Sequence, residues 1–381
     1  MTLIVPRYGG ENISDVYGSV LSFFGIASKR KLKADVGKGN RLVLLVLDGL
    51  GTRTLEDSLP ASALQGFERS NITSVFPSTT CVAMPGLYMG MTPAEHGVFG
   101  FTSFIKELGT IVNMFNLSHP SQDEQLPSLA NDFESYIGNV FPPLGKKLQS
   151  SGVASRAIWP SLDLRWQWQG LPISGMEKVR YYSPWDALTA LKDSLKGDSG
   201  PAFVTVYIPF VDTLSHHYGP GSQQTKEAVR GLFAMLSSCV GACKDFTLLV
   251  TADHGQANNR KTNFVDEELL SMLDMPPFGD SRAVFLKTRQ EEKVGRYMEK
   301  RFPRFQLYTK REALDKMLFG SARMSQRFSE RLGDLVAVPD CDESLLYPFL
   351  RTKSMDYYSY LGQHGGLTTE EQQVPLLMMR K

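Results

Sequence analysis

The strongest constraint on the fold is a continuous apolar run, RLVLLVLDGLG (41–51), in which Asp-Gly directly follows the apolar residues. A run of this length without polar alternation is typical of a strand that is buried on both faces. Comparable short runs recur along the chain, at 202–210, 245–255 and 373–379. Strands of this kind need cover on both faces of their sheet, which favours an α/β fold.

Segments with helical spacing separate these runs. LGKKLQSSG (144–152) ends at a glycine, as helices often do, and VASRAIW (153–159) follows as the next expected strand. TKEAVRGLFAMLSSCV (225–240) carries apolar residues at helical spacing. The alternation of strands and helices predicts an α/β sandwich with a mostly parallel central sheet.

The pattern of residues divides the chain into three parts. Residues 1–38 are expected to form an N-terminal leader, which is basic and poor in large apolar groups toward its end. Residues 39–260 and 356–381 have the character of one core, because the final segment returns to apolar strand-like sequence. Between them, residues 261–355 change to short strands and charged helices, which predicts a small inserted α+β cap.

Composition bears on the class of protein. With 42% apolar and 21% charged residues, the chain is ordinary for a soluble globular protein. A net charge of +1 gives no signature of a broad nucleic-acid or membrane surface. The sequence has no apolar run of about 18 residues, so no membrane span is predicted. The start, MTLIVPRYGG, lacks a stretch of signal-peptide length. We expect a cytoplasmic protein, and the oligomeric state stays open.

Polar residues with the chemistry of metal ligands follow the apolar runs. Taken alone, each is often a helix cap or a turn residue. The chain has six histidines, and three of them fall at these strand ends, so the combination is more specific than any part. The carboxyl ends of parallel strands are where open α/β sheets bind ligands. The candidate residues are Asp48, Asp212, His216, Asp253, His254 and His364.

Three carboxylates and three imidazoles suit two divalent metal ions. Zinc is the best match to mixed nitrogen and oxygen ligands, and manganese is compatible with the same set. A pair of such ions can hold both the attacking and the leaving oxygen of an in-line displacement. The four cysteines form neither a C-x-x-C zinc pattern nor a dense disulfide framework.

A further candidate is VFPSTTCVAMPGLYMG (75–90), where Thr79 and Thr80 precede a short expected helix. A hydroxyl at a helix N-terminus faces the positive end of the helix dipole, and coordination to a metal would lower its pKa further. One of these threonines is therefore a candidate nucleophile. The alternative is that both only cap the helix.

Together these motifs resemble one family. LLVLDGLG, VFPSTT with GMTPAEHG, D-x-x-x-H-x-x-G-P, VTADHGQ and GQHGG occur in the order of the type I phosphodiesterase/nucleotide pyrophosphatase family, within the alkaline phosphatase superfamily. The resemblance covers roughly 41–100, 202–256 and 360–379. It implies an alkaline-phosphatase-like three-layer sandwich and a two-metal hydrolase. The substrate it implies is a small phosphate ester, of nucleotide type, with a phosphodiester or pyrophosphate bond.

The resemblance also implies roles for single residues. Asp48, Asp253, His254 and the nucleophile would bind one metal ion, and Asp212, His216 and His364 would bind the other. The family's threonine falls on Thr80, with Thr79 one residue early. Asn113 is the candidate for the asparagine that helps bind phosphate in this family. His217 is a less favoured ligand than His216, and His96 resembles a structural residue.

Departures from the family pattern keep other functions open. CVAM follows Thr80, where many nucleotide pyrophosphatases have FPN. The sulfatase motif C/S-x-P-x-R is absent, and no arginine closely follows the threonines as in a monoesterase of the alkaline phosphatase type. The alternatives are a phosphonoacetate-type hydrolase, a phosphomonoesterase or phosphotransferase, and a non-catalytic metal or phosphate binder. Aromatic residues of the cap would either stack on a base or fill the cap's own core: Phe305, Tyr308 and Phe319.

Overall fold

A computed structural model describes residues 1–122, 124–138, 142–161, 170–196, 200–241, 243–320, 324–349 and 359–381. Its larger sheet has seven strands in the order β2-β17-β8-β1-β7-β5-β6. The strands are β1 (Arg41–Leu47), β2 (Glu68–Thr73), β5 (Ala154–Pro160), β6 (Glu177–Tyr181), β7 (Ala202–Ile208), β8 (Thr247–Thr251) and β17 (Gln373–Arg380). The four apolar runs at 41–51, 202–210, 245–255 and 373–379 thus all form strands of this sheet.

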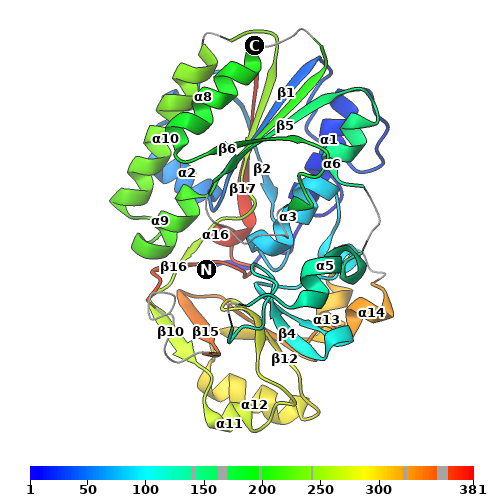
Figure 1. The fold of residues 1–381 in the computed structure, drawn as a ribbon. Coiled ribbons are helices and arrows are strands. Elements are labelled where there is room, and N and C mark those ends of the chain that lie inside the picture. The colour runs from blue at the N-terminus through cyan, green and yellow to red at the C-terminus, as the bar shows by residue number, and fades with distance from the viewer. Residues whose placement is uncertain are drawn as a thin grey trace.

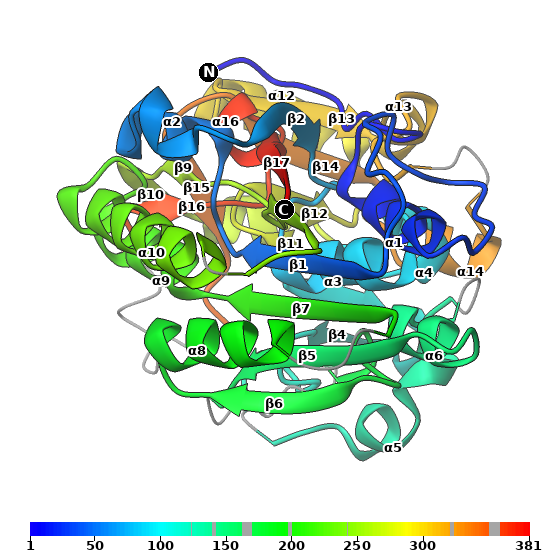
Figure 2. The ribbon, with the colours of Figure 1, turned by 90° about the horizontal axis from the view of Figure 1, so that it is seen from above.

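The larger sheet is mostly parallel. β1 pairs in parallel with β7 on one side and β8 on the other, and β5 lies in parallel between β7 and β6. Figure 2 shows β1, β7, β5 and β6 side by side in this order. Only β17 runs against its neighbours β8 and β2. The carboxyl ends of the parallel strands therefore lie together along one side of the sheet. This side faces the lower half of the molecule in Figure 1.

Helices cover both faces of this sheet and make a three-layer sandwich (Figure 1). One face carries α2 (Thr52–Ser58), α8 (Pro184–Leu195), α9 (Phe210–Tyr218) and α10 (Gln223–Gly241). The other carries η1 (Ile13–Asp15), α1 (Val16–Phe23), α3 (Thr80–Met89) and α6 (Leu144–Gln149). The α/β fold with a mostly parallel central sheet is thus confirmed.

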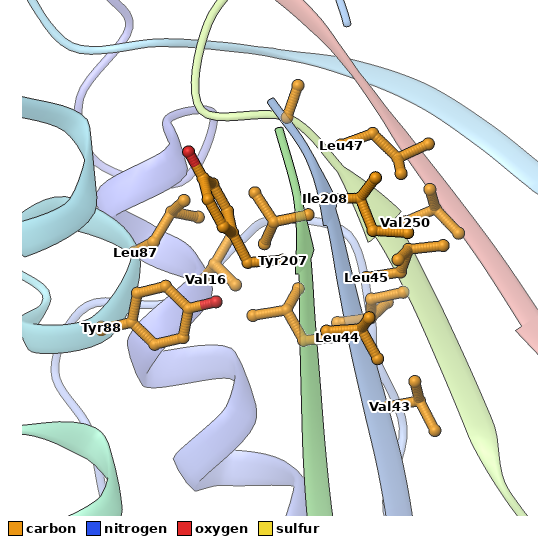
Figure 3. Close-up of a cluster of buried hydrophobic side chains, with 14 of the residues drawn as sticks. Val16, Val43, Leu44, Leu45, Leu47, Leu87, Tyr88, Tyr207, Ile208 and Val250 are labelled. Atoms are coloured by element: carbon orange, nitrogen blue, oxygen red, sulfur yellow. The ribbon is translucent and has the colours of Figure 1, made fainter. Parts of the chain in front are cut away.

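The core lies between these layers. On the side of α1 and α3, Tyr207 packs near Tyr88 and Leu87, whereas Leu45 and Val250 lie on the opposite side of the sheet (Figure 3). All of these side chains are buried. Alternate residues of a strand point to opposite faces, so an unbroken apolar run supplies both layers of the core.

A second sheet lies below the first in Figure 1. It has six strands in the order β13-β14-β12-β11-β3-β4, and every pair is antiparallel. The strands are β3 (Thr102–Ile105), β4 (Thr110–Asn113), β11 (Phe278–Asp280), β12 (Ala283–Leu286), β13 (Phe305–Thr309) and β14 (Leu335–Pro339). α11 (Glu267–Leu270), α12 (Glu291–Arg301) and α13 (Lys310–Asp315) belong to the same half of the molecule.

Short elements complete the described chain. β9 (Ala257–Asn258) pairs with β16 (Gly362–Gln363), and β10 (Lys261–Phe264) pairs with β15 (Glu343–Leu346). The remaining elements are η2 (Ala61–Leu64), α4 (Pro93–His96), η3 (Lys106–Leu108), α5 (Pro127–Tyr136), α14 (Gln326–Ser329) and α16 (Thr369–Gln372). Among the described residues, no helix is long and apolar enough to cross a membrane.

The division into leader, core and cap stays a prediction, and its boundary at 355/356 lies outside the described residues. Two observations bear on it. Residues 102–113, which the sequence assigns to the core, supply β3 and β4 to the second sheet. Within the expected leader, α1 buries Val16 and Val20 completely against the main core. Both contacts are made by segments far apart in sequence, which a local pattern does not reveal.

Candidate metal centre

Three parallel strands deliver the candidate ligands to one place. Asp48 directly follows β1, Asp212 lies in the first turn of α9 after β7, and Asp253 follows β8. Gly49 has a φ of +74° and lets these loops approach, since a Cβ atom there would lie 2.7 Å from the Asp212 Cα. The edge of the sheet therefore concentrates carboxylates that are remote in sequence.

The first group of side chains is the Asp48 cluster, which comprises Asp48, Asp253, His254 and Thr80. His254 Nε2 lies 3.5 Å from Asp48 Oδ1, 3.5 Å from Asp253 Oδ2 and 3.2 Å from Thr80 Oγ1. Asp48 Oδ1 and Asp253 Oδ2 are buried and have no hydrogen-bond partner. Buried carboxylate oxygens without a partner carry a large desolvation cost, and a cation between them would offset it.

The second group is the Asp212 cluster, which comprises Asp212, His216 and His364. His216 Nε2 lies 3.4 Å from Asp212 Oδ1 and 3.2 Å from His364 Nε2. The distance from His364 Nε2 to Asp212 Oδ1 is 3.8 Å. The rings of His254 and His364 stack with their centroids 3.9 Å apart, so the two clusters adjoin.

The spacing of these atoms fits a tetrahedral metal ion. Ligands at about 2.0–2.2 Å from a zinc ion stand about 3.3–3.6 Å apart. The separations of 3.2 to 3.5 Å around His254 and His216 are close to that value. Asp48, Asp253 and His254 offer ligand atoms within 4.8 Å of one another, as do Asp212, His254 and His364. His254 therefore lies close to both sets.

Backbone carbonyl groups fix the orientation of all three imidazoles. Each ring donates its Nδ1–H to a carbonyl oxygen: His216 to Gly362 at 2.8 Å, His364 to Ser78 at 3.0 Å, and His254 to Gly255 at 3.1 Å. A carbonyl oxygen only accepts, so the Nε2 atom of each ring keeps its lone pair. These lone pairs point into the clusters, as metal ligation requires.

Two further side chains orient the carboxylates, and the sequence reasoning gave them no role. The Tyr207 hydroxyl donates a hydrogen bond to Asp48 Oδ2, and the Gln256 amide donates to Asp212 Oδ1. Asp253 Oδ1 accepts the backbone N–H groups of Gly49 and His254 at 3.3 and 3.0 Å. In each of the three aspartates, one carboxylate oxygen thus accepts hydrogen bonds from the protein. The sequence offered one signal for each residue: Tyr207 is a polar residue within the apolar strand β7, and Gln256 directly follows the DHG motif.

Burial and crowding disfavour the charged forms of the side chains in both clusters. Burial raises the pKa of Asp48 well above its usual range, and repulsion by Asp253 and Asp212 adds to this. Burial lowers the pKa of His364 well below its usual range, with contributions from His254 and His216. A divalent cation would relieve the repulsion between the carboxylates, and the neutral His364 ring is already in the form that binds a metal ion.

The two adjacent threonines face different partners. Thr80 begins α3, and its hydroxyl lies beside His254 in the Asp48 cluster. Thr79 is the N-cap residue of α3, but its side chain makes no capping hydrogen bond. Asp280, which the sequence reasoning did not single out, lines the same cavity as both threonines. This arrangement favours Thr80 as the residue next to a metal ion.

A cavity of about 300 Å³ opens beside the clusters. Thr80, Asp212, His216 and His364 line it, together with three aromatic residues, Phe101, Phe115 and Tyr360. The aromatic residues considered from the sequence lie elsewhere: Phe305 and Phe319 are buried in cores of the lower half, and Tyr308 packs against one of them. Filling the core is therefore what the structure shows for these three side chains.

The remaining candidates lie at the margin of the site or away from it. The side-chain oxygen of Asn113 accepts the backbone N–H groups of Phe115 and Asn116, at 2.9 and 3.4 Å, in a turn after β4. His217 lines the cavity, with its ring 5.2 Å from that of Tyr360. His96 is buried, accepts the Val98 N–H at 3.2 Å, and has its pKa lowered to about 3 by burial.

Asp280 is a buried carboxyl group in the wall of the same cavity. Burial raises its pKa to about 7, and the opposing hydrogen bonds from the Phe101 N–H and from Thr79 only partly offset this. The Phe101 N–H donates to Asp280 Oδ2 at 3.2 Å. Asp280 ends β11, so the second sheet contributes directly to the cavity.

Comparison with known proteins gives a consistent result. A family model described as type I phosphodiesterase / nucleotide pyrophosphatase matches residues 42–367. Ectonucleotide pyrophosphatase/phosphodiesterase family member 7 of Mus musculus is 23% identical over 313 residues, which are 73% of this chain and 66% of that protein. The chain thus spans just under two thirds of that relative.

Two solved structures are similar in fold. An inactive form of murine ectonucleotide pyrophosphatase/phosphodiesterase 5 in complex with AMP has a TM-score of 0.63 and 17% identity, covering 88% of this chain and 87% of that one. Phosphonoacetate hydrolase from Sinorhizobium meliloti 1021 in complex with phosphonoformate has a TM-score of 0.63 and 17% identity, covering 90% of each chain.

Proposed function

The chain belongs to the type I phosphodiesterase / nucleotide pyrophosphatase family, and from this premise we propose that it is a two-metal hydrolase. The proposed reaction is cleavage of a phosphodiester or pyrophosphate bond in a nucleotide-type small molecule, with Thr80 as the nucleophile. The observation that carries the proposal is the position of Thr80 Oγ1, 3.2 Å from His254 Nε2 and beside two sets of carboxylate and imidazole groups.

The side chains divide into two sets of metal ligands under this proposal. Asp48, Asp253, His254 and Thr80 would hold one ion, and the Asp212 cluster would hold the other. Zinc is the best match to these nitrogen and oxygen atoms, and manganese is compatible with them. When bound, the two ions supply positive charge for the phosphoryl oxygens and lower the pKa of the coordinated hydroxyl.

The residues of the chain then perform two displacements. Thr80 loses its hydroxyl proton to solvent, and its oxygen forms a bond to phosphorus while the bond to the leaving oxygen breaks. The leaving oxygen departs with the electron pair and takes a proton from solvent. Water attacks the resulting phosphothreonine, and the threonine oxygen leaves and is protonated again. The N-terminus of α3 faces the phosphoryl group and stabilises its negative charge.

The cavity supports a small substrate. A volume of about 300 Å³ suits one phosphate ester with a compact organic group, and Phe101, Phe115 and Tyr360 offer apolar walls for a planar group. AMP is the ligand of the similar murine structure, which agrees with a nucleotide-type substrate. Phosphonoacetate-type hydrolysis is the second candidate, because a phosphonoacetate hydrolase shares the fold.

Initial rates on three substrates test the proposal: bis-p-nitrophenyl phosphate, p-nitrophenyl phosphate and phosphonoacetate. We expect the diester to react fastest, activity to vanish on chelation, and zinc or manganese to restore it. Thr80→Ala should lower kcat by about 10³-fold or more, since nucleophile removal in hydrolases costs this much. Thr110→Ala, at a threonine on β4 that does not belong to the cavity lining, is the control.

Other outcomes reassign the reaction. Preference for the monoester would indicate a phosphatase, and turnover of phosphonoacetate alone would indicate the second candidate. Two bound metal ions without turnover of any of the three substrates would contradict the hydrolase proposal and favour a binding protein.

A further inference from the structure

Glu371 connects the two loops that carry His254 and His364. Its backbone carbonyl group accepts the N–H of Gly255, the residue after His254, at 2.8 Å. Its carboxylate oxygen Oε1 accepts the N–H of Gly366, two residues after His364, at 2.8 Å. The two imidazole rings stack with their centroids 3.9 Å apart. One residue thus holds both loops at the place where the two clusters adjoin.

The Glu371 carboxylate does more than cap its own helix. In the capping box of α16, Glu371 Oε2 accepts the N–H and the hydroxyl group of Thr368, at 3.2 and 2.6 Å. A capping box joins only the first residues of a helix. The carboxylate also meets Gly366 so closely that a Cβ atom there would lie 2.7 Å from Glu371 Oε2. Glu371 therefore fixes the His364 loop in addition to the helix.

Arg282 holds the same carboxylate from the second sheet. Arg282 directly precedes β12, and both Arg282 and Glu371 are fully buried. The guanidinium donates to Glu371 Oε1 at 2.8 Å and to Oε2 at 3.1 Å. It also donates to the backbone carbonyl groups of Cys341 and Glu343, at 2.8 and 2.7 Å. A carboxylate with charged and neutral donors on both oxygens has little freedom to move.

We infer that Glu371 is a positioning residue that holds the His364 ring in place for the metal ion of the Asp212 cluster. This role rests on the proposed function, because it requires the two metal ions. Loss of the carboxylate removes the partner of the Gly366 N–H and loosens the His364 loop, and a displaced ligand binds its ion less tightly. The Gly255 contact uses the backbone carbonyl group of Glu371, so it survives a side-chain substitution. The effect should therefore fall on one metal ion of the two.

Competition with a chelator tests this role by measuring the affinity of both zinc ions in each variant. Glu371→Met removes both carboxylate oxygens and should weaken one of the two zinc ions by about 10- to 100-fold, as loss of an outer-sphere partner does. The other zinc ion should keep its affinity. Glu371→Gln retains one acceptor oxygen for the Gly366 N–H and should lose less affinity than Glu371→Met.

Arg331→Met is the matched control for a broken buried ion pair. Arg331 is buried, pairs with Glu107 at 2.6 Å, and donates to two backbone carbonyl groups, as Arg282 does. Its loss should destabilise the fold, because it takes a charged partner from Glu107 and orphans two carbonyl groups. The control should nevertheless bind both zinc ions as tightly as the wild type.

A double variant separates positioning from stability. Glu371→Met alone leaves the Arg282 charge buried without its counter-charge, which destabilises the fold. Arg282→Met combined with Glu371→Met removes both charges, so the free energy of unfolding should recover. The affinity of the one zinc ion should stay low, because the Gly366 N–H still lacks its acceptor. The double variant also keeps the role testable if Glu371→Met does not fold.

Three outcomes would overturn the positioning role. Glu371→Met could bind both zinc ions as tightly as the wild type, it could weaken both ions equally, or the double variant could regain the lost affinity together with stability. A wild type that does not bind two zinc ions would instead contradict the proposed function.

Discussion

The Nε2 atoms of His216 and His364 lie 3.2 Å apart, although 148 residues separate the two histidines in the chain. Each ring donates its Nδ1–H to a carbonyl oxygen, so two lone pairs face each other. A proton could bridge them, but burial and the neighbouring histidines lower the pKa of His364 and disfavour that proton. The geometry of the pair suits the metal ion that we propose for the Asp212 cluster better than a shared proton.

The first prediction concerns metal content. His216→Ala should reduce the bound zinc from two equivalents per chain to about one, because it removes a ligand of the Asp212 cluster. His217→Ala, at the adjacent residue, should keep both equivalents. Elemental analysis of protein purified after equilibration with zinc measures the difference. Equal metal content in the two variants would show that His216 is not a ligand.

The second prediction concerns the hydroxyl group behind Asp48. Tyr207→Phe removes the hydrogen bond to Asp48 Oδ2 and should weaken metal affinity by about 10- to 100-fold, as loss of an outer-sphere partner does. Competition with a chelator measures the affinity. Tyr88→Phe is the control, because it also loses a buried hydrogen bond, to Thr205, without touching a carboxylate. A similar loss in both variants would argue against a role for Tyr207.

The third prediction concerns pH and the metal-free protein. Burial raises the pKa of Asp280 from the ordinary 3.8 of an aspartate to about 7 in the folded chain, so the folded state keeps a proton that the unfolded state loses. Stability from this group is therefore highest below about pH 4 and falls as pH rises toward 7. Asp280→Asn lacks this dependence.

Relative to the wild type, Asp280→Asn should thus gain stability between about pH 4 and 7, by up to about 4 kcal/mol. Urea unfolding at a series of pH values gives the difference. A difference between the two proteins that is constant over this range would contradict the raised pKa.

The fourth prediction concerns the buried ion pair. Glu371→Gln leaves the Arg282 charge buried without its counter-charge and should lower the free energy of unfolding by about 3–5 kcal/mol. Arg304→Met breaks the exposed pair with Asp340 and should leave the free energy of unfolding nearly unchanged, because solvent screens an exposed pair. Urea unfolding of the zinc-saturated proteins measures the free energy of unfolding of both variants. An equal loss in the two variants would contradict a dominant contribution of the buried Arg282–Glu371 pair to stability.

Much of the fold could be predicted because its signals are local. The run at 41–51 became β1, and the spacing at 225–240 became α10 (Gln223–Gly241) with its boundaries within two residues. Strands buried on both faces leave an unmistakable apolar run. The placement of β3 and β4 in the second sheet was missed, because strand pairing across more than 150 residues has no local signature.

The candidate site divides in the same way. Its chemically distinctive residues, such as Asp48 and His254, were found from their types and their positions after strands. Tyr207, Gln256 and Asp280 were not, because tyrosine, glutamine and aspartate have many ordinary uses. Asn113 was proposed from the resemblance alone, and in the structure its side chain closes a turn. Metal identity, cytoplasmic location and oligomeric state stay predictions or open questions.

The sequence by itself determined the α/β class, the family and the set of candidate metal ligands, since these follow from residue types at fixed local spacing. Only the tertiary structure decided which threonine lies beside His254, which buried carboxylate oxygens lack a hydrogen-bond partner, and which aromatic residues line the cavity. Those facts depend on distances of a few ångströms between segments such as 78–80, 280–282 and 362–366. Long-range packing sets such distances, and no single segment encodes them.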